Sequence, residues 1–138
     1  MYSQIRTSML DGICAMPVQV EVDISMGMPV FDMVGYLSPE VREAKERVRT
    51  ALHNCGILLP AKRITVNLSP ANIRKTGTGF DLPIAVALLV AMDLVKPDKC
   101  AGTIFSGELN LSGQLLPVRG ILPMVSDGVK EGIHKFVV

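Results

Sequence analysis

The sequence contains no tryptophan, and aromatic residues make up only 4% of its 138 positions. Proteins that bind single-stranded nucleic acid commonly stack bases on aromatic side chains, so little material is available here for such a platform. Charged residues are also few, at 20%, and the formal net charge is +1. The total charge therefore gives no electrostatic signal for nucleic acid or an anionic membrane, although a local basic patch is compatible with it.

The sequence also lacks the cysteine spacings and the long apolar segments that define several protein classes. Its three cysteines, Cys14, Cys55 and Cys100, are scattered and form no C-x-x-C pair. This argues against a disulfide framework or a metal centre and fits a reducing cytoplasm. The N-terminus has no signal-peptide core. The longest apolar run, Leu82–Met92, is shorter than the roughly 18 to 20 residues that span a bilayer. We expect a cytoplasmic protein with no membrane partner.

Hydrophobic residues make up 49% of the chain, and its length suits one domain, 1–138, with a substantial core. Alternating apolar and polar residues predict strands at 18–25 and 63–68, with 31–34 as a returning strand. Ser38 as N-cap and Pro39 at the first helical position predict a helix that ends at Gly56. The remaining pattern predicts a buried helix at 82–93, a hairpin of 103–109 and 114–118 turned at Ser112-Gly113, a helix at 121–131 and a strand at 134–138.

This order of elements predicts an α+β fold, a mixed α/β sandwich in which helices pack mainly on one face of a mixed sheet. The candidate sites lie around the stretch RKTGTGFDLPIAV, from Arg74 to Val86. A phosphate-binding P-loop places its lysine after the glycines, whereas Lys75 precedes them here. Asp81 at the helix entrance would repel phosphate but suits the free N–H groups of a helix start. We therefore interpret the stretch as a flexible turn with Asp81 as N-cap.

Nucleophilic catalysis has little support from sequence motifs. The four serines in turn-like or polar contexts have no G-x-S-x-G or S-x-x-K motif around them, and we interpret them as turn or cap residues: Ser69, Ser106, Ser112 and Ser126. Contact with DNA is the other possibility, through basic residues that could gather at the loop end of the sheet: Lys62, Arg63, Arg74, Lys75 and Arg119. The simpler alternative is that this basic loop meets another domain or a neighbouring subunit.

Four segments resemble one family closely and together cover most of the chain. They are GMPVFDMVG (27–35), VREAKERVRTAL (41–52), RITVNLSPANIRKTGTGFDLPIAVALL (63–89) and SGELNLSGQLLPVRGILP (106–123). They are similar to the N-terminal domain of the bacterial magnesium-chelatase-like AAA+ ATPases, the ComM and YifB family. The chain departs from the family pattern at Tyr36-Leu37-Ser38-Pro39, where a Leu-Pro-Asp type of turn is usual.

The resemblance implies a Lon-protease-like fold, which is shared with GHMP kinases and a ribosomal-protein domain. Lon proteases use a serine at the start of a buried helix and a lysine that follows a hairpin. The serine position falls on Asp81 and the lysine position on Met124, so both members of the dyad are absent. The resemblance therefore implies a domain without a catalytic site. The alternative is the proteolytic domain of an ATP-dependent Ser-Lys protease, which requires a serine and a lysine paired elsewhere in the fold.

The family also implies partners and cofactors outside this sequence. Its members carry an AAA+ domain after this one, so ATP and magnesium are expected there and no cofactor is expected within 1–138. The implied partners are the protein's own AAA+ domain and the neighbouring subunits of a hexamer, with DNA as a further candidate. The resemblance associates the domain with DNA processing, specifically branch migration during natural transformation, as an accessory to hexamer assembly or DNA engagement.

Overall fold

A computed structural model describes all 138 residues. The main sheet has six strands in the order β3-β4-β2-β1-β5-β8. These are β1 (Tyr2–Asp11), β2 (Cys14–Ser25), β3 (Val30–Val34), β4 (Arg63–Ser69), β5 (Thr103–Phe105) and β8 (Lys135–Val137). Pairs β1–β2 and β2–β4 are antiparallel, and the other three neighbouring pairs are parallel. A separate hairpin joins β6 (Glu108–Leu109) to β7 (Leu115–Leu116).

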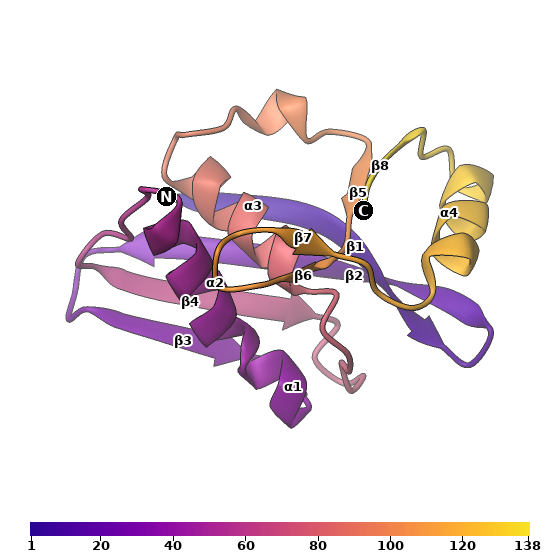
Figure 1. Cartoon of the computed structure of the whole chain (residues 1–138), viewed down its shortest axis with the longest axis horizontal. Helices are drawn as coiled ribbons and strands as arrows, with labels where there is room; N and C mark the ends of the chain where they lie inside the picture. The colour runs from indigo at the N-terminus through magenta and orange to yellow at the C-terminus, as the bar shows by residue number, and fades with distance from the viewer.

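Four α-helices accompany the sheet: α1 (Pro39–Arg42), α2 (Ala44–Asn54), α3 (Asp81–Ala91) and α4 (Ile121–Lys130), with a short 3₁₀ helix, η1 (Pro97–Lys99). In Figure 1, α2 and α3 lie across the strands, whereas α4 lies at the β5–β8 end of the molecule. The predicted α+β fold, with a mixed sheet and helices mainly on one face, is confirmed. No helix in the structure is both long and apolar enough to span a membrane.

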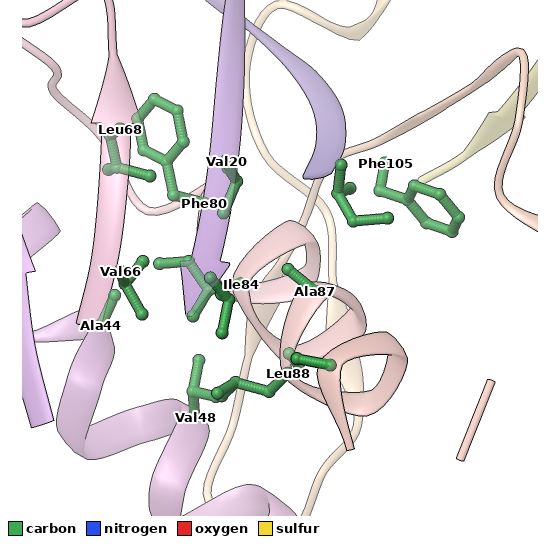
Figure 2. Packing of buried hydrophobic residues seen from close by; sticks show 14 of the residues in the cluster. Val20, Ala44, Val48, Val66, Leu68, Phe80, Ile84, Ala87, Leu88 and Phe105 are labelled. Carbon is green, nitrogen blue, oxygen red and sulfur yellow. The ribbon is translucent and has the colours of Figure 1, made fainter. Parts of the chain in front are cut away.

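The hydrophobic core lies between the sheet and helices α2 and α3. Figure 2 shows Ile84 and Leu88 of α3 packed among side chains from α2, β2 and β4. Val20, Val66 and Leu88 are completely buried. The predicted helix at 82–93 is therefore the central element of the core, as an apolar sequence on all sides indicates. A second, smaller cluster, Ile104, Met124 and Ile133, holds α4 against β5.

The helix predicted after Ser38 is present but interrupted. Ser38 is its N-cap residue and Pro39 its first helical residue, yet the Ser38 hydroxyl makes no capping hydrogen bond. The helix is divided into α1 and α2 at Glu43. Gly56 follows α2 with a φ of +83°, a backbone conformation that glycine adopts without strain, and this confirms the predicted stop.

Two predicted strand pairings were wrong. Strand β3 does not return along β2; it lies parallel to β4, which separates it from β2. Alternation identifies a half-buried strand but not its neighbour, and the helices between β3 and β4 provide the crossover that a parallel pair requires. The segment 103–109 is also not one hairpin strand. Its first part, β5, joins the main sheet, and only Glu108 and Leu109 pair with β7.

Strand β1 was absent from the prediction. Its buried positions alternate as Ser3, Ile5, Thr7 and Met9, so half of the inward side chains are polar and the alternation is hidden. Burial of such groups is favourable only when they find partners. The Ser3 hydroxyl donates a hydrogen bond of 2.6 Å to the Ala87 carbonyl of α3, which ties the first strand to the central helix.

Candidate functional site at the start of helix α3

Asp81 is the first residue of α3 and is completely buried. Its carboxylate is held by Arg47 of α2 through two hydrogen bonds, Nε–Oδ2 at 2.7 Å and Nη2–Oδ1 at 3.0 Å. Such a bidentate pair is among the stronger charge-assisted contacts in proteins. The N-cap residue of α3 is Phe80, and no side chain makes a capping hydrogen bond at this helix start. The predicted N-cap role of Asp81 was therefore wrong, and the carboxylate is one half of a buried ion pair.

The same carboxylate also positions the hairpin that follows β5. The Leu109 amide donates to Asp81 Oδ2 at 3.0 Å. Two backbone hydrogen bonds lie beside it, from the Gly107 amide to the Gly79 carbonyl at 3.0 Å and from the Leu82 amide to the Gly107 carbonyl at 3.1 Å. The start of α3, helix α2 and the hairpin therefore meet at Asp81.

Arg47 has further acceptors that orient it. Its Nη2 donates to the Glu40 carbonyl at 2.9 Å, and its Nη1 lies 3.7 Å from Glu43 Oε2. The contact with Glu43 is the i,i+4 pair that the helix sequence offers. Burial raises the pKa of Asp81 above its ordinary value, while the guanidinium and the Leu109 amide act in the opposite direction. The hydrogen bond to Asp81 raises the pKa of Arg47. The pair therefore neutralises the charge of Asp81 within the protein.

Lys75 is completely buried, which separates it from the other candidate DNA contacts. Its ammonium donates to the Pro70 carbonyl, and burial lowers the pKa of this lysine. The backbone around it is fixed as well, because the Lys75 amide donates to the Tyr36 carbonyl and the Ser38 amide donates to the Lys75 carbonyl. The buried ammonium cannot offer its charge to DNA at the surface in this conformation.

The loop before α3 is tied down at further points along its length, in contrast to the flexible turn predicted. The Gly77 amide donates to Glu40 Oε1 at 3.1 Å, and this bond is the main cause of the lowered pKa of Glu40. The Thr76 amide contacts Met9 Sδ at 3.2 Å. The loop is thus fastened to α1 and to β1, and its course past the start of α3 is defined.

The other candidate basic residues do not form one cluster. Arg63 is the first residue of β4, a strand of seven residues, whereas the loop that carries Arg74 follows the other end of this strand. At about 3.3 Å per residue the two ends of β4 are roughly 20 Å apart. Arg63 lies near Asp32 instead, at 3.8 Å. Arg119 lines a pocket together with Thr76 and Gly77, so Arg119 and Arg74 belong to the same end of the sheet and Arg63 does not.

The two positions of the absent dyad also differ in their surroundings. Met124 of α4 is buried and lines the pocket, next to Ser106 and Gly79. Asp81 does not line the pocket, since its carboxylate is bonded to Arg47 and Leu109. No lysine ammonium in the 138 residues donates a hydrogen bond to a serine hydroxyl; the one bonded lysine, Lys75, contacts the Pro70 carbonyl.

Three residues of this site were not identified from the sequence. They are Arg47, which pairs with Asp81, and Ser8 and Ser106, which line the pocket. The sequence pattern does not single out Arg47, because its main partner, Asp81, lies 34 positions away. The available signal was Asp81 itself, because a carboxylate that precedes an entirely apolar helix is rarely buried without a cationic partner. Ser106 was interpreted as a turn residue, and the structure buries it in the pocket.

These features define a class of protein: a mixed α/β domain whose central helix starts at a buried arginine–carboxylate pair. Residues 20–138 match the model of the family described as subunit ChlI of Mg-chelatase, and the chain belongs to that family. It is 42% identical over 130 residues to the uncharacterized protein YifB of Escherichia coli, covering 94% of this chain and 26% of that protein. It is 46% identical over 120 residues to the competence protein ComM of Haemophilus influenzae, covering 87% of this chain and 23% of ComM. The chain thus spans about a quarter of the length of these relatives.

The ion pair leads to a prediction about stability. We expect Asp81→Ala to lower the free energy of unfolding by about 3 to 5 kcal/mol, because it leaves Arg47 without its buried partner. Glu43→Ala removes the exposed partner of the same arginine and is expected to cost about 0 to 1 kcal/mol. Urea unfolding followed by circular dichroism measures both. Equal losses in the two variants would contradict a structural role for the buried pair.

Lys75 leads to a prediction about pH dependence. Its folded-state pKa is lowered, so the unfolded chain binds more protons between that value and the ordinary value of 10.5. Stability should therefore rise with pH in this window as the buried ammonium loses its charge. We expect Lys75→Met to lose this rise and exposed Lys62→Met to keep it, in urea unfolding at a series of alkaline pH values. An unchanged pH profile in Lys75→Met would show that the ammonium is solvated.

Proposed function

We propose that this chain is a non-catalytic N-terminal accessory domain of a magnesium-chelatase-like AAA+ ATPase, and that it assists hexamer assembly or DNA engagement in DNA processing. The observation that carries the non-catalytic part is the buried Asp81–Arg47 pair. The Asp81 carboxylate is completely buried and already accepts three hydrogen bonds, two from the Arg47 guanidinium and one from the Leu109 amide, and a thioether at Met124 cannot act as a base. ATP and magnesium would then be bound by other parts of the whole protein.

The part of the proposal that concerns DNA rests on the similarity to the competence protein ComM and on two exposed arginines, Arg74 and Arg119. Branch migration of DNA during natural transformation is the process that we propose for the whole protein. The alternative, a Ser-Lys protease domain, lacks support because no serine hydroxyl is hydrogen-bonded to a lysine ammonium.

A peptidase assay tests the non-catalytic part. We expect the purified 138-residue chain to leave fluorescently labelled casein uncleaved, since no activated nucleophile stands at the start of α3. Any cleavage should be equal in the wild type and in Ser106→Ala, which would assign it to a contaminant. Cleavage that disappears in Ser106→Ala, with folding intact by circular dichroism, would establish a serine peptidase and overturn the proposal.

Charge reversal tests DNA engagement. We expect the double variant Arg74→Glu and Arg119→Glu to weaken binding of duplex DNA and to reduce the slope of log affinity against log salt by roughly two, because each arginine neutralises one phosphate. Arg63→Glu is the matched control at the far end of β4 and should leave the affinity unchanged. Fluorescence anisotropy at several salt concentrations measures both quantities. An equal loss in Arg63→Glu, or no loss in the double variant, would contradict a DNA contact at this end.

A further inference from the structure

A pocket of about 410 Å³ lies between the loop before α3, the second half of β1 and the start of α4. Its lining residues include Gly79 and Phe80 before α3, two serines, Ser8 and Ser106, and the exposed Arg119. None of its 13 lining residues is acidic, and Arg119 is the only charged one. The lining residues thus carry one positive charge, while the carboxylate of Glu40 contacts them from outside the pocket by accepting from the Gly77 amide.

The pocket contains polar groups that have no partner in the protein. The Ser8 hydroxyl is buried and makes no hydrogen bond. Ser106 is only 2% exposed and lines the pocket; its hydroxyl makes no hydrogen bond within the protein but, unlike that of Ser8, is not sealed from solvent. The amides of Thr78, Gly79 and Phe80 are also without an acceptor. Buried polar groups are nearly always hydrogen-bonded in folded proteins, so a set of unpaired donors around one pocket indicates that a ligand supplies the acceptor.

The position of the pocket favours an anion for a second reason. It lies at the N-terminus of α3, an 11-residue helix whose dipole places partial positive charge there. A free Asp81 carboxylate at the start of α3 would repel an anion. In the structure that carboxylate is neutralised by Arg47 and does not line the pocket. The repulsion is therefore weakened, and the amides at the helix start remain able to attract negative charge.

Gly79 is required for the shape of the pocket. A Cβ at this position would lie 2.9 Å from the Ser106 hydroxyl oxygen and 3.5 Å from a Val118 methyl carbon, so any side chain would fill the space between them. The walls beyond the polar groups include Leu10, Pro117 and Val118, which suits an apolar substituent next to the anion.

We propose that this pocket binds the phosphate group of a small phosphate ester. The hydroxyls of Ser8 and Ser106 and the amides of Thr78 to Phe80 would donate hydrogen bonds to the phosphate oxygens, and Arg119 would supply the counter-charge. A carboxylate accepts about four hydrogen bonds, all close to one plane, whereas the oxygens of a phosphate group accept more and point in several directions. The two hydroxyls, three amides and Arg119 offer more donors than a carboxylate can use, so they favour phosphate. The inference goes beyond the accessory function proposed above and does not depend on it.

Titration of the ¹⁵N-labelled 138-residue chain, followed by nuclear magnetic resonance, tests the site with three probes: inorganic phosphate, phenyl phosphate and acetate. We expect saturable shifts of the amide signals of Thr78, Gly79 and Phe80. Phenyl phosphate should bind more tightly than inorganic phosphate because of the apolar wall, and acetate more weakly than both. We expect Ser106→Ala and Arg119→Ala each to weaken phosphate binding about tenfold or more, as loss of a hydrogen bond to a charged group predicts.

Arg63→Ala is the matched control, because it removes an exposed arginine remote from the pocket. Gly79→Ala blocks the pocket without removing a donor and should abolish binding; its spectrum reports whether the fold persists. Absence of saturation, shifts that fall outside the pocket, or equal weakening by Arg63→Ala would each overturn the proposal. Acetate binding as tightly as phosphate would overturn the assignment to phosphate. None of these outcomes depends on DNA binding or on peptidase activity.

Discussion

The ion pair between Arg47 and Asp81 is the constraint on which the arrangement of this domain depends. It joins α2 to the start of α3, and through the Leu109 amide it also holds the hairpin of β6 and β7. These elements are distant in sequence and are separated by loops that could otherwise take many paths. A bidentate contact fixes distance and orientation together, so it sets how α2 packs against the start of α3, to which the Leu109 amide then fastens the hairpin.

A buried ion pair is not in itself a strong source of stability, because desolvation of both charges offsets most of their attraction. Both effects act on the pKa of Asp81: burial raises this pKa, and the Arg47 guanidinium opposes that rise. The value of the pair lies in specificity. A pair of apolar residues at these positions could slide or rotate, whereas a carboxylate with both oxygens bonded to one guanidinium has one low-energy geometry.

The sequence is sufficient to predict those elements whose side chains follow a simple period. Helix α3 is apolar on all sides and is therefore buried, and β4 alternates without exception. Strand β1 cannot be predicted in this way, because the polar residues Ser3 and Thr7 occupy inward positions and hide its alternation. The site is less predictable for a different reason. Its central contact joins residues 34 positions apart, and both Arg47 and Arg49, the other arginine of α2, have a glutamate nearby in the sequence. Likewise, only the fold determines that Arg63 is remote from Arg119 and that Lys75 points inward.

The same ion pair decides what the start of α3 can do chemically. Without Arg47, a carboxylate beside the helix N-terminus would satisfy the free amides itself and exclude other anions. Because Asp81 is drawn toward α2, the amides of Thr78, Gly79 and Phe80 stay without an acceptor, and the neighbouring pocket has Arg119 as its only charge. The Asp81 carboxylate thus has a structural role at the start of α3, and the space beside it is lined by one charged residue, Arg119. The packing of α2 against α3 and the unpaired amides beside the pocket are therefore linked through a single contact.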